Sequence, residues 1–255
     1  MIESTFVLLN GVGEYTERRL WANGIPNWEA FLTLPSIPGI GKQRKQLHDQ
    51  DLLAATASLA RGDARYFARR LKTRDSWRLF QRFRLGAVYL DIETTGGASA
   101  YGDITVVGMY ANGQMTSLVK GDTLTARRLE LELGRYDLIV TFFGSVFDLP
   151  YLRAKFPGLP LDHAHLDLCY AARRLGLRGG LKHLEQSVGI HRSDDLQGLT
   201  GWDAVTLWHD AQRGDQRSRE RLLRYNEADC RNLEFLADTL CRQLTARCRG
   251  EAHAQ

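Results

Sequence analysis

The chain has 255 residues, of which 44% are hydrophobic and 25% are charged, and its formal net charge is +4. This balance is typical of a globular protein with one large domain, or with a large and a small domain. No apolar run approaches the roughly 20 residues of a membrane helix, which excludes a membrane-spanning protein. The N-terminus shows no secretory signal. The four cysteines form no C-x-x-C pair, so we expect reduced thiols in a cytoplasmic protein.

The first 84 residues are expected to form a small, all-helical module. Helices are predicted up to about Trp21, over Trp28–Leu34 with Asn27 as the N-cap, and from Lys42 onward. A basic segment follows at residues 61–85, where nine Arg or Lys residues stand against two Asp, with aromatic residues between them. Such a segment can follow a phosphate backbone, or it can form two amphipathic helices with solvated basic faces.

Two G-x-G turns in this module each precede a predicted helix, and they contain Gly11 and Gly13, and Gly39 and Gly41 followed by Lys42. Glycine lets backbone N–H groups approach a phosphate, and the N-terminus of a helix favours negative charge. Both turns resemble the helix-hairpin-helix elements of proteins that bind nucleic acid without sequence specificity, and the first turn matches better. The alternative is a helical cap that only packs on the main domain.

Strands begin after residue 85. The pattern predicts strands at Ala87–Ile92, Ile104–Ala111 and Met115–Val119, with a hairpin turn at Asn112-Gly113. The remaining elements are a helix at Asp122–Gly134, a strand at Leu138–Phe143, a helix at Val146–Phe156, a strand at His165–Leu168, and helices to Cys248 interrupted by a polar loop at His191–Gly198. This order predicts an α/β domain over residues 85–248, with a ribonuclease H-like mixed sheet flanked by helices.

Two acids lie at the end of the first predicted strand. Side chains alternate along a strand, so Asp91 and Glu93 face the same side, roughly 6.6 Å apart. In a buried position this pair would cost several kcal/mol unless a positive group lies beside it. A solvated strand end is the alternative for this pair.

Two further acids stand at positions that suggest a site. Asp148 lies near the start of a predicted helix, where the helix dipole favours a carboxylate. Asp229 falls inside the apolar stripe that contains Leu222 and Leu233, with Tyr225 one turn before it. A buried acid must be paired or must bind a metal, so the alternative is an Asp held by hydrogen bonds or by an arginine.

Together, Asp91, Glu93, Asp148 and Asp229 form a candidate metal site. Hard oxygen ligands suit Mg²⁺ or Mn²⁺. Four carboxylates can hold two such ions, which would stabilise the attacking and leaving oxygens of phosphodiester cleavage.

The motifs L-D-I-E-T-T-G, F-D-x-P and Y-x-x-x-D, in that order, resemble the three exonuclease motifs of the DEDD (DnaQ-like) superfamily, tyrosine branch. The segments around Asp167, Lys182 and Asp229 are similar to a bacterial ribonuclease H-like subgroup of predicted exonucleases. The resemblance implies 3′-to-5′ removal of nucleotides. It implies that Asp91 bridges two ions, that Glu93 and Asp229 complete the first site, and that Asp148 holds the second ion through water. Tyr225 would orient the attacking water.

The chain departs from the family pattern at Phe143-Gly144, where Asn-Gly is common, and at Gly96-Gly97, where Gly-Leu is common. Both departures concern substrate contacts. We expect Asp167 to position a loop or to support the site from behind the metal ligands. Lys182 is expected either to contact phosphate or to lie at the surface, and Trp202 and Trp208 are expected to be packing residues.

The sequence therefore predicts a metal-dependent 3′-to-5′ exonuclease whose partner is nucleic acid, DNA or RNA, with no membrane partner. A nucleic-acid-binding module of this fold without turnover is the first alternative, and a structure-selective endonuclease is the second. The sequence does not choose between DNA and RNA, and it predicts no oligomeric state.

Overall fold

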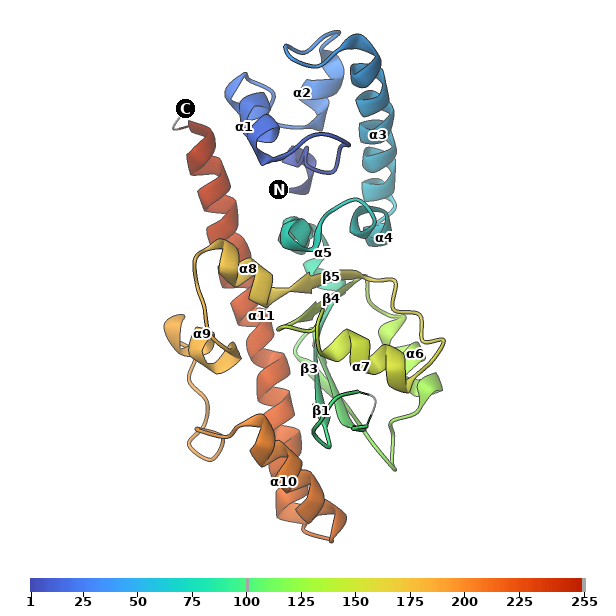
Figure 1. Ribbon diagram of the computed structural model, residues 1–255, viewed down its shortest axis with the longest axis vertical. Coiled ribbons are helices and arrows are strands. Elements are labelled where there is room, and N and C mark those ends of the chain that lie inside the picture. Colours follow the sequence, from blue (N-terminus) through green and yellow to red (C-terminus); the bar gives the residue numbers. More distant parts are fainter. Residues whose placement is uncertain (100, 254–255) are drawn as a thin grey trace.

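The computed structural model describes residues 1–99 and 101–253, and it shows an elongated molecule (Figure 1). A group of short helices lies at one end, and a sheet with its flanking helices lies beside the longest helix (Figure 1). The N-terminal helices are η1 (Ile2–Ser4), α1 (Glu14–Ala22), α2 (Trp28–Thr33), α3 (Lys42–Ala60), α4 (Ala64–Ala68), η2 (Thr73–Leu79), α5 (Phe80–Phe83) and η3 (Arg84–Gly86).

Local capping sets the starts of two of these helices. The side chain of Asn27 accepts a hydrogen bond from the backbone N–H of Ala30, 2.9 Å away, as expected for the N-cap of α2. Asp63 caps α4 in the same way through the N–H of Tyr66, at 3.0 Å. The helices then bury aromatic side chains against one another, and Trp28 stacks on Phe67.

The five strands form one mixed sheet. They are β1 (Ala87–Thr94), β2 (Ile104–Ala111), β3 (Gln114–Val119), β4 (Leu138–Thr141) and β5 (Ala164–Asp167), in the order β3-β2-β1-β4-β5. The first three strands are antiparallel neighbours, and β4 and β5 add in parallel. Asn112 and Gly113 both have positive φ, 50° and 79°, which fits the predicted hairpin turn.

Helices cover both faces of the sheet. They are α6 (Ala126–Leu133), α7 (Asp148–Lys155), α8 (Leu168–Arg174), α9 (Leu181–Ser187), α10 (Gly201–Gln212) and α11 (Gln216–His253). Helices α6 and α7 pack on one face, while α8 and α11 pack on the other. The predicted order of elements is confirmed, although α6 starts at Ala126 rather than at Asp122. Residues 120–124 instead form a turn in which the backbone N–H groups of residues 122–124 donate to the carbonyl oxygen of Val119. The side chain of Thr125 then caps the helix.

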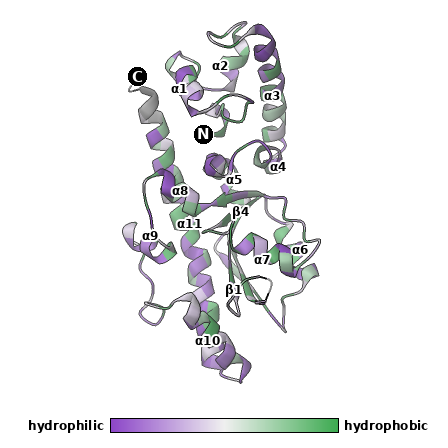
Figure 2. Ribbon diagram, in the orientation of Figure 1, coloured by the Kyte–Doolittle hydropathy of each residue, from purple (hydrophilic) through white to green (hydrophobic). Residues whose placement is uncertain are grey.

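Hydrophobic and hydrophilic residues alternate along α11 (Figure 2), as expected for a helix with one side against a sheet. Over residues 1–99 and 101–253, the helices that are long enough to cross a membrane are not apolar enough to do so.

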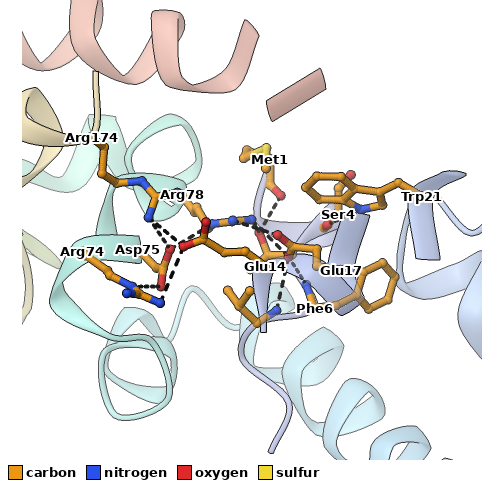
Figure 3. Close-up of polar contacts among 12 residues, drawn as sticks. Met1, Ser4, Phe6, Glu14, Glu17, Trp21, Arg74, Asp75, Arg78 and Arg174 are labelled. Atoms are coloured by element: carbon orange, nitrogen blue, oxygen red, sulfur yellow. Dashed lines mark hydrogen bonds and ion pairs between the residues drawn. The ribbon is translucent and has the colours of Figure 1, made fainter. Parts of the chain in front are cut away.

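A buried ion pair joins two of the N-terminal helices, α1 and η2 (Figure 3). The carboxylate of Glu17, on α1, accepts hydrogen bonds from both terminal nitrogens of Arg78, on η2, at 3.1 and 2.8 Å. The same carboxylate accepts the backbone N–H groups of Phe6 and Val7. Both charged side chains are only 1% exposed. A buried ion pair is stable only when further hydrogen bonds support it, as those from Phe6 and Val7 do here, so this pair holds α1 in one position.

A second ion pair connects α1 to the domain that contains the sheet. Arg174, at the end of α8, donates to Glu14 at 2.9 Å and lies 3.5 Å from Asp75 (Figure 3). The apolar core is also continuous across the two parts, because Phe6 and Leu236 belong to the same cluster of buried side chains. The N-terminal helices therefore pack directly against the domain that contains the sheet.

Removing Glu17 should destabilise the whole chain. In Glu17→Ala, Arg78 keeps its charge in a buried position without its main partner, and such a loss typically costs about 3–5 kcal/mol. Chemical unfolding followed by circular dichroism measures this cost. The control is Asp162→Ala, which breaks an ion pair with Arg65 in which both side chains are 49% exposed, and it should cost under about 1 kcal/mol. Equal effects of the two variants would contradict the structural role of Glu17.

Candidate metal centre and active site

Two of the predicted site residues come from β1, the middle strand of the sheet. In the antiparallel register Asp91 lies opposite Gly108 and Glu93 lies opposite Val106. Both side chains point to the face that α11 covers, because their carboxylates approach residues of that helix. The alternation predicted from the sequence therefore holds.

The lack of a side chain at Gly108 allows α11 to approach the sheet closely. A Cβ atom at Gly108 would lie 2.0 Å from Oδ1 of Asn226 and 2.7 Å from Sγ of Cys230, which is closer than atoms can approach. In the space that glycine leaves, Asn226 donates from Nδ2 to Oδ2 of Asp91, at 2.9 Å. Sequence reasoning did not single out Asn226. The available signal was its position four residues after Leu222, in the same apolar stripe as Asp229.

Asp229, on α11, completes a cluster of three carboxylates. Asp91, Glu93 and Asp229 each offer an oxygen, and these oxygens lie within 4.8 Å of one another. Oε1 of Glu93 is buried and has no hydrogen-bond partner among the described residues. A buried carboxylate oxygen without a donor and a set of hard oxygen ligands both fit a divalent cation such as Mg²⁺ or Mn²⁺.

Asp148 lies beside this cluster but outside the group of three. It is the first residue of α7, and its Oδ1 accepts the backbone N–H of Ile92, on β1, at 3.2 Å. The structure thus brings all four predicted acids to one end of β1, with three of them sharing the centre.

Burial and mutual repulsion change the acidity of the cluster. Burial, and then the charges of the neighbouring acids, raise the pKa values of Asp91 and Glu93 well above their usual range. Burial also raises the pKa of Asp148, to about 7. The pKa of Asp229 is raised by burial, while the charge of Arg192 opposes this shift. Carboxylates that are buried close together in this way are stabilised by a cation that binds to them.

Tyr225 lies one turn before Asp229, as predicted, and Lys182 contacts it. The ammonium group of Lys182 is 2.9 Å from the phenol oxygen of Tyr225. Burial and the three nearby acids raise the pKa of Tyr225 above its usual value, so the phenol keeps its proton at neutral pH. Tyr225 can therefore orient a water by hydrogen bonding, and it is unsuited to be a base. Lys182, expected at a phosphate, is in contact with this tyrosine.

Arg192 is a member of the site that sequence reasoning missed. It lies in the loop between α9 and α10, and its guanidinium group contacts Asp229 and Glu185. The sequence did indicate that a buried Asp229 requires a partner, and an arginine was one of the possibilities. The position of Arg192, 37 residues earlier in the chain, gave no signal by itself.

Asp167 holds the loop between β4 and α7, as expected for a positioning acid. It accepts hydrogen bonds from the backbone N–H groups of Phe143, at 2.8 Å, Ser145 and Cys169. Phe143 has a φ of 64°, a left-handed conformation that asparagine adopts more readily than phenylalanine. Asn-Gly is therefore the easier pair for this turn, and here the hydrogen bonds to Asp167 hold Phe143 in it.

The prediction that Trp202 is a packing residue is wrong, because its side chain is 75% exposed. Trp208 is buried, as predicted. The two residues are six apart on α10, so they lie on different faces of the helix. A Cβ at Gly96 would lie 3.6 Å from the ring of Trp202, so this exposed ring lies beside the loop that follows Glu93.

The four glycines that were predicted to contact nucleic acid lie away from the carboxylate cluster. Gly11 and Gly39 have φ values of 75° and 82°, and Gly13 and Gly41 are the N-caps of α1 and α3. Both turns, with Lys42, belong to the group of N-terminal helices and not to the carboxylate cluster (Figure 1).

The raised pKa of Asp148 predicts a pH-dependent stability. Its folded-state pKa of about 7 lies above the usual 3.8, so the stability from the protonated group is complete below about pH 4 and is lost as the pH rises through 7. Asp148→Asn mimics the protonated state. Without metal at pH 8, this variant should be more stable than the wild type by at least about 1 kcal/mol. Unfolding in chelator at pH 4 and pH 8 measures the difference, and a difference that is equal at both pH values would contradict the shift.

Comparisons with known proteins agree with this architecture. A family model of the RNase H superfamily matches residues 88–241. The chain is similar to the Nibbler EXO domain of Aedes aegypti, with 14% identity, a TM-score of 0.50, and coverage of 70% of this chain and 90% of that chain. A second similar structure is described as the apo form of a nuclease, with 20% identity, a TM-score of 0.48, and coverage of 72% and 84%.

A third similar structure is the family B DNA polymerase from the hyperthermophilic archaeon Pyrobaculum calidifontis. It has 19% identity and a TM-score of 0.49, and the match covers 60% of this chain but only 24% of the polymerase. A comparison with curated protein sequences gives no match. At 14% identity, the likeness to the Nibbler EXO domain indicates a shared fold and nothing more. Because the family model covers more than half of the chain, the chain belongs to the RNase H superfamily.

Proposed function

We propose that this chain is a metal-dependent 3′-to-5′ exonuclease of the tyrosine branch of the DEDD superfamily, acting on single-stranded ends of nucleic acid. One observation carries the proposal. The oxygens of Asp91, Glu93 and Asp229 lie within 4.8 Å of one another. Asp148 lies beside them on α7, and Tyr225 lies one turn before Asp229. These residues have the chain order of the three exonuclease motifs that the sequence resembles, and four carboxylates can hold two ions for phosphodiester hydrolysis.

Mg²⁺ or Mn²⁺ would supply charge stabilisation for the attacking and leaving oxygens. Asp91 would bridge the two ions, Glu93 and Asp229 would complete the first site, and Asp148 would hold the second through water. The Oε1 of Glu93 supports this assignment, because it is a buried carboxylate oxygen without a hydrogen-bond donor among the described residues.

The remaining residues of the site would position the water and the strand. Tyr225 would donate its hydrogen bond to the attacking water or to the scissile phosphate. The contact between Lys182 and the phenol oxygen would fix the direction of that hydrogen bond. Burial of the cluster keeps bulk water away, which strengthens each of these interactions.

The N-terminal helices would hold the strand outside the active site. Arg44, on α3, lies next to Gly11, and Arg19, on α1, lies next to Gly39, so each helix presents an arginine at the turn of the other. The first turn of α3 contains no acid, whereas α1 begins with Glu14. The turn of Gly39, Gly41 and Lys42 is therefore the better suited of the two to a phosphate.

The first test is degradation of 5′-labelled single strands of DNA and of RNA with Mg²⁺ or Mn²⁺. We expect a ladder of products shortened from the 3′ end. Asp91→Asn and Asp229→Asn should lower the rate by at least about 1,000-fold, because each removes a metal ligand. The exposed Asp162→Asn is the matched control and should cleave like the wild type. The ladders on matched DNA and RNA also identify the preferred substrate.

Three outcomes would contradict the proposal. Binding of the strands without cleavage, unchanged by a chelator, would indicate a binding module with a nuclease-like fold. Internal cuts in a strand blocked at its 3′ end would indicate an endonuclease. Equal activity of Asp229→Asn and the wild type would place catalysis elsewhere.

The exposed ring of Trp202 should stack on a base of the bound strand. Such stacking on an aromatic side chain is worth about 1–3 kcal/mol per base. In chelator, which blocks cleavage, Trp202→Ala should weaken binding of a single strand by roughly tenfold, and fluorescence anisotropy measures the change. The control is Phe235→Ala, an exposed aromatic residue on α11, which should bind normally. An equal loss for both variants would refute a specific stacking role.

A further inference from the structure

Arg192 joins the carboxylate cluster to the segment that contains α9. Its guanidinium group forms two hydrogen bonds to Glu185, from Nε at 2.8 Å and from a terminal nitrogen at 2.6 Å. That same terminal nitrogen also contacts Oδ1 of Asp229. The side chains of Arg192 and Glu185 are 6% and 2% exposed, so the three charges interact away from water.

Glu185 alone is sufficient to neutralise Arg192. The two-point contact is the strong geometry for a guanidinium and a carboxylate. Asn232, on α11, donates a further hydrogen bond to Glu185 at 3.1 Å, which fixes the acid in place. The contact with Asp229 therefore adds to an ion pair that already exists, and losing it leaves the charge of Arg192 paired with Glu185.

Asp229 can interact with two cations, a metal ion and the guanidinium group of Arg192. It is one of the three acids whose oxygens surround the candidate metal position, and it is also the acid that Arg192 contacts. When the guanidinium group contacts Asp229, it occupies one oxygen of that carboxylate, and its positive charge repels a divalent cation nearby. Arg192 and the metal thus compete for the same carboxylate.

We propose that Arg192 is an internal counter-ion, which holds Asp229 in the metal-free protein and releases it, while keeping Glu185, when a divalent cation binds. It is a positioning residue that stabilises the metal-free cluster and weakens metal binding. The inference rests on the proposed function only in that the cluster binds metal. Lys182 lies one turn before Glu185 on α9, and Glu185 pairs with Arg192. Residues 182–192 therefore contact both Tyr225, through Lys182, and Asp229, through Arg192. Metal binding would thereby be linked to the position of the tyrosine.

The test is calorimetric titration of Mn²⁺ into the full chain without nucleic acid. The double variant Glu185→Gln/Arg192→Met removes the pair as a unit and leaves no buried charge from it. This variant should bind Mn²⁺ about tenfold more tightly than the wild type, within the usual range of coupling between two sites. In the single variant Glu185→Gln, Asp229 becomes the main partner of the Arg192 charge. This variant should therefore bind Mn²⁺ several-fold more weakly than the wild type.

The matched control is Asp210→Asn/Arg213→Met, which removes an exposed acid–arginine pair on α10 and should not change Mn²⁺ binding. Thermal unfolding in chelator gives a second measurement, in which the Glu185→Gln/Arg192→Met variant should unfold at a lower temperature and gain more from Mn²⁺ than the wild type does.

Two results would overturn the inference, and they can be told apart. If the wild type binds Mn²⁺ and the double variant binds equally or more weakly, Arg192 does not compete with metal, and the proposed function stands. If neither protein binds Mn²⁺, the inference fails together with the metal-dependent function.

Discussion

The crowding of buried carboxylates at one end of β1 is the constraint on which the site depends. Asp91, Glu93 and Asp229 repel one another away from water, and burial alone already disfavours their charges. The surrounding groups counter this repulsion, because Asn226 donates to Asp91 and Arg192 contacts Asp229. A cluster that is only partly compensated by the protein has a strong preference for an added cation.

The scaffold keeps the cluster together by linking distant parts of the chain through one helix. Helix α11 carries Tyr225, Asn226 and Asp229 on the side that faces the sheet, and it continues until it packs against α1. The ion pair between Glu17 and Arg78 fixes α1 in turn. The surface that is proposed to hold the strand is therefore connected to the proposed metal centre through packed helices.

The sequence predicted the order of strands and helices and the positions of all four acids, for physical reasons that are local. Alternation places Asp91 and Glu93 on one face, and an acid in an apolar stripe marks Asp229. The missed features depend on contacts between residues far apart in the chain. Gly108 matters only because Asn226, more than a hundred residues later, needs its space. Arg192 has meaning only beside Asp229, and the exposure of Trp202 depends on which face of α10 packs on α11.

The departures from the exonuclease motifs that the sequence resembles lie apart from the acid cluster. The four acids are coupled by charge, so replacing one changes the balance of all of them. Phe143 and the Gly96-Gly97 pair are outside this coupling. Phe143 is partly exposed on a loop that Asp167 holds, and the loop of Gly96 lies against the exposed ring of Trp202. Such positions can change without disturbing the cluster. An exposed tryptophan beside Gly96 supplies an aromatic surface on α10 near the place where the family has an apolar side chain on the loop. The acids of the interior and the residues at the rim are thus physically separate, so the rim can vary while the acid cluster keeps its arrangement.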